Sequence, residues 1–137
     1  MDREVFEQLK AEGYNRIPVH RSVLNWLRTV LPAGCIVHHC RNEINLSGGI
    51  VARKLAEAKR MGQVTGFPDL LILPYATVGA CFFEIKAEGN YASKTQKQVH
   101  DQLRALGYKV AVVRSIEDAR EALEDFGVGF NEPGRGK

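Results

Sequence analysis

Apolar side chains recur at helical spacing in several parts of this chain. Residues 19–31 carry such a stripe, which ends where a proline and a glycine break the pattern. After Ser93, apolar positions at Val99, Leu103 and Leu106 predict a second amphipathic helix. Further helices are predicted over residues 2–12, 50–61 and 115–126.

Short β-rich runs alternate with these helices. Residues 70–73 and 80–86 are separated by a turn, which predicts an antiparallel hairpin. A helix joins the second run to residues 108–113, so these two strands are expected to be parallel neighbours. With a short strand at residues 35–38, the order of elements predicts an α/β fold with a mixed central β-sheet flanked by α-helices.

Length and composition are those of one globular domain. The chain has 137 residues, of which 45% are hydrophobic and 26% are charged. No apolar run approaches the roughly 18 residues of a membrane span, and the N-terminal residues do not resemble a signal peptide. We therefore expect a cytoplasmic protein with no membrane partner. We expect residues 1–126 to form the single domain and the glycine-rich residues 127–137 to form a flexible tail.

Charge and cysteine content bear on the kind of partner and on the redox state of the cysteines. A net charge of +3 is compatible with a polyanionic partner without requiring one. The three cysteines are an odd number in a chain expected to be cytoplasmic, so we expect them to be reduced. Residues 35–40 contain two cysteines and two histidines, but their spacing lacks the paired ligands of structural zinc modules, which favours strand packing.

Two carboxylates and a lysine are candidates for chemistry. Glu84 and Lys86 share one face of a strand, and the connection from Asp69 is long enough to bring that carboxylate beside Glu84. Oxygen ligands of this kind suit Mg²⁺ or Mn²⁺. The alternative is a surface ion pair of Glu84 and Lys86, with Asp69 ending a turn. Gln96 favours a site, because its amide lies on the inward stripe of the next helix and needs a polar partner.

A family resemblance follows from motifs that occur in a fixed order. The motifs are GFPD at 66–69, FEIK at 83–86, SKTQ at 93–96 and GYKVAVVRS at 107–115. Together they resemble the VRR-NUC (virus-type replication-repair nuclease) family of the PD-(D/E)xK superfamily, over about residues 19–125. The resemblance implies a restriction-endonuclease-like core and metal-dependent hydrolysis of DNA phosphodiester bonds by an endonuclease.

The resemblance also implies roles for individual residues. Asp69 and Glu84 correspond to metal ligands, joined by the main-chain carbonyl of Ile85. Lys86 corresponds to the catalytic lysine and Gln96 to the glutamine that opens the following helix. The implied catalytic set is therefore Asp69, Glu84, Lys86 and Gln96, and the implied cofactor is Mg²⁺, with Mn²⁺ able to substitute.

One part of the family pattern is missing. Relatives often carry a further glutamate ligand on the first helix, and residues 16–20 contain none. Asn42 and Glu43 resemble an accessory element of the family. Glu43 could replace the missing ligand or help to arrange the loop, or water could fill the position.

Basic residues and the family resemblance together indicate DNA as the partner. The candidates for contacts to DNA phosphates are Lys54, Lys59, Arg60, Lys94 and Lys97. The alternative for each is a solvated helix face. Stand-alone relatives resemble phage enzymes that act as homodimers on branched DNA such as Holliday junctions, which implies a bacterial, phage or prophage setting. A less selective or single-strand nuclease, or an inactive nucleic-acid-binding module, remains the alternative.

Overall fold

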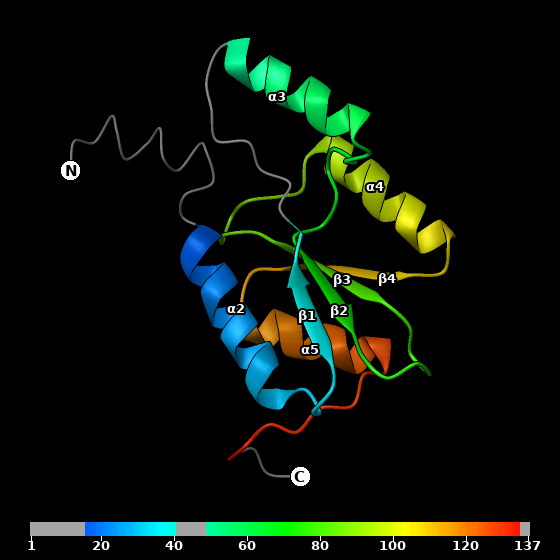
Figure 1. Cartoon of the computed structure of the whole chain (residues 1–137). Coiled ribbons are helices and arrows are strands. Elements are labelled where there is room, and N and C mark those ends of the chain that lie inside the picture. Colours follow the sequence, from blue (N-terminus) through cyan, green and yellow to red (C-terminus); the bar gives the residue numbers. More distant parts are fainter. Residues whose placement is uncertain (1–15, 41–48, 135–137) are drawn as a thin grey trace, which may run out of the picture.

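The computed structural model describes residues 16–40 and 49–134 of the chain, without the side chains of residues 49–52 and 55 (Figure 1). The helix predicted over residues 2–12 and the accessory residues Asn42 and Glu43 lie outside the described residues.

The elements predicted within the described residues are present, with ends shifted by one or two positions. In chain order they are α2 (Ile17–Val30), β1 (Ile36–His39), α3 (Gly49–Arg60), β2 (Leu70–Leu73), β3 (Cys81–Ile85), α4 (Lys94–Ala105), β4 (Lys109–Val113) and α5 (Ile116–Phe126).

The strands form one mixed four-stranded sheet in the order β1-β2-β3-β4. β1 and β2 are antiparallel, and so are β2 and β3, which confirms the predicted hairpin. β3 and β4 are parallel and are connected through α4. The predicted α/β fold with a mixed sheet and flanking helices is therefore confirmed.

Helices cover both faces of the sheet (Figure 1). α2 and α5 share a core with the sheet residues Ile72, Cys81 and Phe83, whereas α4 packs on the opposite face against Phe82 and Val110. α3 lies at the top of the view, away from α2 and α5. β3 is the most enclosed strand, since every one of its residues is buried. None of the helices in the described ranges combines the length and the apolar character that a bilayer crossing requires.

Local signals explain where the flanking helices begin and end. Ser93 and Ser115 cap α4 and α5, because each hydroxyl accepts a hydrogen bond from the main-chain N–H three residues later. α5 ends at Gly127, whose φ of 78° is in the left-handed region that glycine adopts without strain.

The segment after α5 packs against the domain. Val128 is 5% exposed, and the N–H of Asn131 donates to the carbonyl of Val30 at 2.9 Å. Phe130 lies edge-on to Trp26 with ring centroids 5.6 Å apart. Residues 127–137 were expected to form a flexible tail, and in the described part of this segment apolar side chains pack against α2 and α5.

Candidate active site

The register of the hairpin brings the two predicted acids together. Leu70 pairs with Phe83 and Leu71 with Phe82, so one further step along the same register places Asp69 opposite Glu84. Asp69 is 4% exposed and Glu84 is fully buried. Oδ2 of Asp69 also accepts a hydrogen bond from the N–H of Ile85 at 2.8 Å, which fixes the carboxylate against β3.

The GFPD loop is held against the start of α4 and the end of β1. Gly66 has a φ of +88°, and a Cβ there would lie 3.0 Å from Cγ2 of Thr95 and 3.1 Å from its main-chain carbonyl. Only glycine fits such an approach without displacing the first turn of α4. The carbonyl of Asp69 accepts a hydrogen bond from the N–H of Cys40 at 2.7 Å. The acid is thus positioned by β1, β3 and α4 together.

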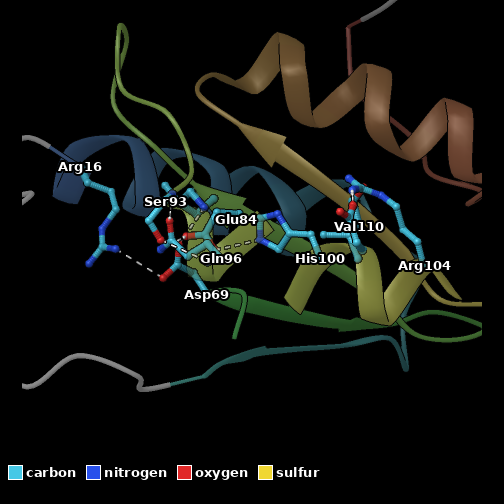
Figure 2. A network of polar contacts seen from close by, with 10 residues as sticks. Arg16, Asp69, Glu84, Ser93, Gln96, His100, Arg104 and Val110 are labelled. Atoms are coloured by element: carbon cyan, nitrogen blue, oxygen red, sulfur yellow. Dashed lines mark hydrogen bonds and ion pairs between the residues drawn. The ribbon is translucent and has the colours of Figure 1, made fainter. Parts of the chain in front are cut away.

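Two side chains of α4 reach the other acid, as Figure 2 shows. Nε2 of Gln96 lies 3.5 Å from Oε2 of Glu84, and Nε2 of His100 lies 3.3 Å from Oε1. Both are long for hydrogen bonds to a carboxylate. Glu84 therefore has polar neighbours but no tightly bound cationic partner among the contacts of the described residues.

Gln96 also closes the N-terminus of α4. The N–H of Ser93 donates to Oε1 of Gln96 at 2.8 Å, while the N–H of Gln96 donates to Oγ of Ser93 at 3.1 Å. This reciprocal pair is a capping box. It directs the amide oxygen to the helix end and leaves the NH₂ group for Glu84, so the polar partner that the inward amide needs is a protein carboxylate.

The inward stripe of α4 differs from the predicted one. Leu106 is 69% exposed, because it follows the last residue of the helix and the stripe ends before it. The inward positions are instead Gln96, Val99, His100 and Leu103, spaced three or four residues apart.

Two basic residues, Arg16 and Lys86, lie close enough to the acids to act on them by charge. Nη1 of Arg16 lies 3.4 Å from Oδ1 of Asp69, on the side away from Gln96 and His100 (Figure 2). Lys86 follows β3 directly, is half-buried, and is anchored by its N–H to the carbonyl of Val113 at 3.0 Å. The stretch at residues 16–20 that lacks a glutamate thus contributes an arginine at the acid pair.

The two acids are strongly coupled. Burial raises the pKa of Glu84 to about 9, and its hydrogen bond and charge interaction with Asp69 add to the shift. The charges of Lys86 and Arg16 oppose the shift without cancelling it. At neutral pH, without a bound cation, the acid pair therefore retains one proton and carries one negative charge instead of two.

Imidazoles near the pair are neutral. Burial lowers the pKa of His100, and the charge of Arg104 lowers it further. Burial and His39 lower the pKa of His20, whose ring is edge-on to that of His39 with centroids 4.5 Å apart. Neither His20 nor His100 supplies a positive charge to the acids at pH 7.

The donor set suits a hard divalent cation. Within residues 16–40 and 49–134, no group of three or more His, Cys, Asp and Glu side chains is arranged to hold a metal ion. Mg²⁺ does not need such a group, since it is usually held by one or two carboxylates together with waters and substrate phosphates. The buried acid pair is suited to such a cation, because the cation can take the place of the proton that the pair retains.

The predicted DNA contacts are all exposed side chains. Lys54, Lys59 and Arg60 lie on α3, and Lys94 and Lys97 lie in the first half of α4. Arg60 forms an ion pair with Glu57 at 2.9 Å, so part of its charge is compensated within α3.

Sequence reasoning missed Arg16 and His100. The spacing of His100 contained a usable signal, because it lies four residues after Gln96 and between the apolar Val99 and Leu103. A polar residue on an apolar helix face needs a buried partner. Arg16 gave no comparable signal, since its position beside Asp69 depends on how α2 packs.

Comparisons with known proteins agree with this fold and with the family resemblance. The family model of the VRR-NUC domain matches residues 10–117. A solved structure described as a VRR_NUC domain protein is similar with a TM-score of 0.65 and 26% identity, covering 84% of this chain and 90% of that chain. A search of curated proteins gives no match. The chain therefore belongs to the VRR-NUC family of nuclease domains.

Proposed function

We propose that this chain is a metal-dependent endonuclease that hydrolyses phosphodiester bonds in DNA. The observation that carries the proposal is the buried pair of Asp69 and Glu84, which lies beside Lys86 in a nuclease-family fold. Two adjacent buried acids are costly in a purely structural role, because the pair must either keep a proton at neutral pH or bind a cation.

Asp69 and Glu84 would hold Mg²⁺, together with the main-chain carbonyl of Ile85, and Mn²⁺ would substitute. When bound, the cation supplies Lewis-acid polarisation of the phosphate and lowers the pKa of the attacking water. Arg16 contacts Asp69 on the side away from α4 and offsets part of the pair's negative charge.

Lys86 and Gln96 act around the acids. The charge of Lys86 is close enough to lower the pKa of Glu84, so the ammonium group can orient the attacking water and offset the charge that develops on the phosphate. The Gln96 NH₂ group lies at the same carboxylate and donates hydrogen bonds without adding charge.

Contacts to DNA outside the acid pair would be made by Lys54, Lys59, Arg60, Lys94 and Lys97. All are exposed, and contacts to phosphates give affinity that depends on salt and tolerates changes of sequence. Tyr91 precedes α4, is 75% exposed, and has the guanidinium of Arg114 5.0 Å from its ring centroid. We propose that a distorted base stacks on this exposed ring.

We further propose that the substrate is branched DNA, such as a Holliday junction, and that the chain acts as a homodimer. Symmetric cutting of two strands requires two active sites related by a twofold axis. The Trp26 indole packs against Phe130 and donates to Glu132 within the same chain, so we place this side chain in the fold of the single chain and not at the dimer surface.

The test uses labelled four-way junction, flap, single-stranded and linear duplex DNA with Mg²⁺, Mn²⁺ or EDTA. The wild type is compared with Lys86→Ala and with Lys109→Ala, a half-buried lysine at the opposite end of the β3–β4 pair. We expect metal-dependent cleavage that Lys86→Ala lowers by a factor of about a hundred or more and that Lys109→Ala preserves.

Three outcomes would count against parts of the proposal. A junction that is bound but uncut in every metal indicates a binding module. Equal cutting of linear duplex and junction removes the preference for branched DNA. Cleavage that persists in EDTA would show that the reaction does not depend on a metal ion.

A further inference from the structure

His100 is the buried polar residue of α4 that the proposed mechanism does not use. It is 2% exposed and lies between Val99 and Leu103, each 8% exposed, on the face that packs against Phe82 and Val110. An apolar side chain would fill this position without needing a hydrogen-bond partner. The presence of imidazole there calls for a reason beyond packing.

The reason is visible in the geometry at Glu84. Nε2 of His100 lies 3.3 Å from Oε1, and Nε2 of Gln96 lies 3.5 Å from Oε2 (Figure 2). One turn of α4 therefore contacts both oxygens of the same carboxylate. Rotation of the Glu84 carboxylate is therefore restricted on the side of α4, while its other side faces Asp69.

The contact has one favourable arrangement once a bound cation has replaced the proton of the acid pair and Glu84 is ionised. A carboxylate only accepts hydrogen bonds, so Nε2 must carry the hydrogen and donate it. A donor in the shell behind a metal-binding carboxylate fixes the orientation of that ligand, and such groups affect metal affinity without touching the ion.

We propose that His100 is a positioning residue, which holds the Glu84 carboxylate in the orientation that lets it bind a divalent cation together with Asp69. This inference rests on the proposed function of the acid pair. It assigns His100 no contact with the cation or with DNA. The competing explanation is that His100 only fills space in the core around Phe82.

The experiment measures Mn²⁺ binding by calorimetry without DNA, for the wild type, His100→Leu and His100→Gln. Gln retains a donor on a side chain that reaches the same carboxylate, whereas Leu fills the site without one. We expect His100→Leu to bind Mn²⁺ about 10 to 100 times more weakly and His100→Gln to recover most of the affinity. Leu103→Met is the matched control, because it alters the same helix face without changing a polar group.

Thermal unfolding in EDTA separates positioning from packing. We expect His100→Leu to unfold at a lower temperature than the wild type, because it leaves Oε1 of the buried Glu84 without its polar contact. The binding measurement is therefore made well below that temperature, where weaker Mn²⁺ binding by the folded variant reports positioning. If the Leu variant does not fold, His100→Met takes its place in the same comparison with His100→Gln.

Wild-type affinity in His100→Leu would overturn the inference, and so would a Gln variant that binds no better than the Leu variant. If the wild type still cleaves DNA, either of these results in the variants leaves the proposed nuclease function intact. A wild type that binds no Mn²⁺ contradicts both the metal-dependent function and the role of His100.

Discussion

Two glutamates with very different surroundings separate the structural part of this domain from its candidate active site. Glu132 accepts hydrogen bonds from Nε and Nη2 of Arg120 at 2.8 and 2.7 Å, and from Nε1 of Trp26 at 2.8 Å. Glu84 is contacted at 3.3 and 3.5 Å by neutral side chains and lies beside a second acid.

The contrast shows what each carboxylate is suited for. A bidentate arginine compensates Glu132, and this hydrogen bond raises the pKa of Arg120. Glu132 thereby ties the segment after α5 to α2 and α5. The pKa of Glu84 is raised to about 9 because burial is not matched by a close cation. One glutamate completes the fold, and the other is arranged to receive a ligand.

Replacing each glutamate by glutamine should lower cleavage in one case and leave it unchanged in the other. Glu84→Gln removes a charge that the cation requires, so we expect cleavage of junction DNA to fall by a factor of about a hundred or more. Glu132→Gln should cleave at the wild-type rate below its unfolding temperature. Rates from gel assays under single-turnover conditions make the comparison, and similar losses in both variants would erase the distinction.

The pH dependence of the free energy of unfolding should also distinguish Glu84 from Glu132. Glu84 has a pKa of about 9 in the folded protein and 4.5 as its ordinary value, so between these values the folded state holds a proton that the unfolded chain has released. Without a divalent cation, this group makes the free energy of unfolding decrease as pH rises from about 4.5 to about 9.

Urea unfolding in EDTA across that range would measure the effect. Glu84→Gln does not titrate, so its stability relative to the wild type should rise with pH, whereas Glu132→Gln should not show this rise. A constant difference between the wild type and Glu84→Gln would mean that the acid pair does not retain its proton.

The smallest expected effect concerns the C-terminal segment. Glu132→Gln replaces a charge-assisted contact by a neutral one, so we expect the unfolding temperature to fall by roughly 3–6 °C. Differential scanning calorimetry would detect such a shift. An unchanged unfolding temperature would show that the apolar contacts of Val128 and Phe130 hold the segment without Glu132.

The sequence was most informative where local rules decide the structure. The turn between two apolar runs predicted a hairpin, and pairing of those runs brings Asp69 beside Glu84 almost unavoidably. Ser93 and Ser115 correctly predicted where α4 and α5 begin, because capping depends on residues within one helical turn.

Features that depend on distant contacts were harder to predict. The glycines after α5 suggested mobility, but Phe130 and Glu132 contact Trp26, more than a hundred residues earlier in the chain. The apolar stripe of α4 was also predicted incorrectly. It was extended to Leu106, which lies beyond the end of the helix and is exposed, whereas the buried position at His100 was not included.

The position of the cation tests the central claim most directly. Crystals of the wild type and of Glu84→Gln, grown with Mn²⁺, would be compared by anomalous scattering. We predict a peak between the carboxylates of Asp69 and Glu84 in the wild type, at metal–oxygen distances of about 2.0–2.3 Å, and no peak there in the variant. A wild type that cleaves DNA in Mn²⁺ but binds the ion elsewhere, or shows no peak at this pair, would contradict the account.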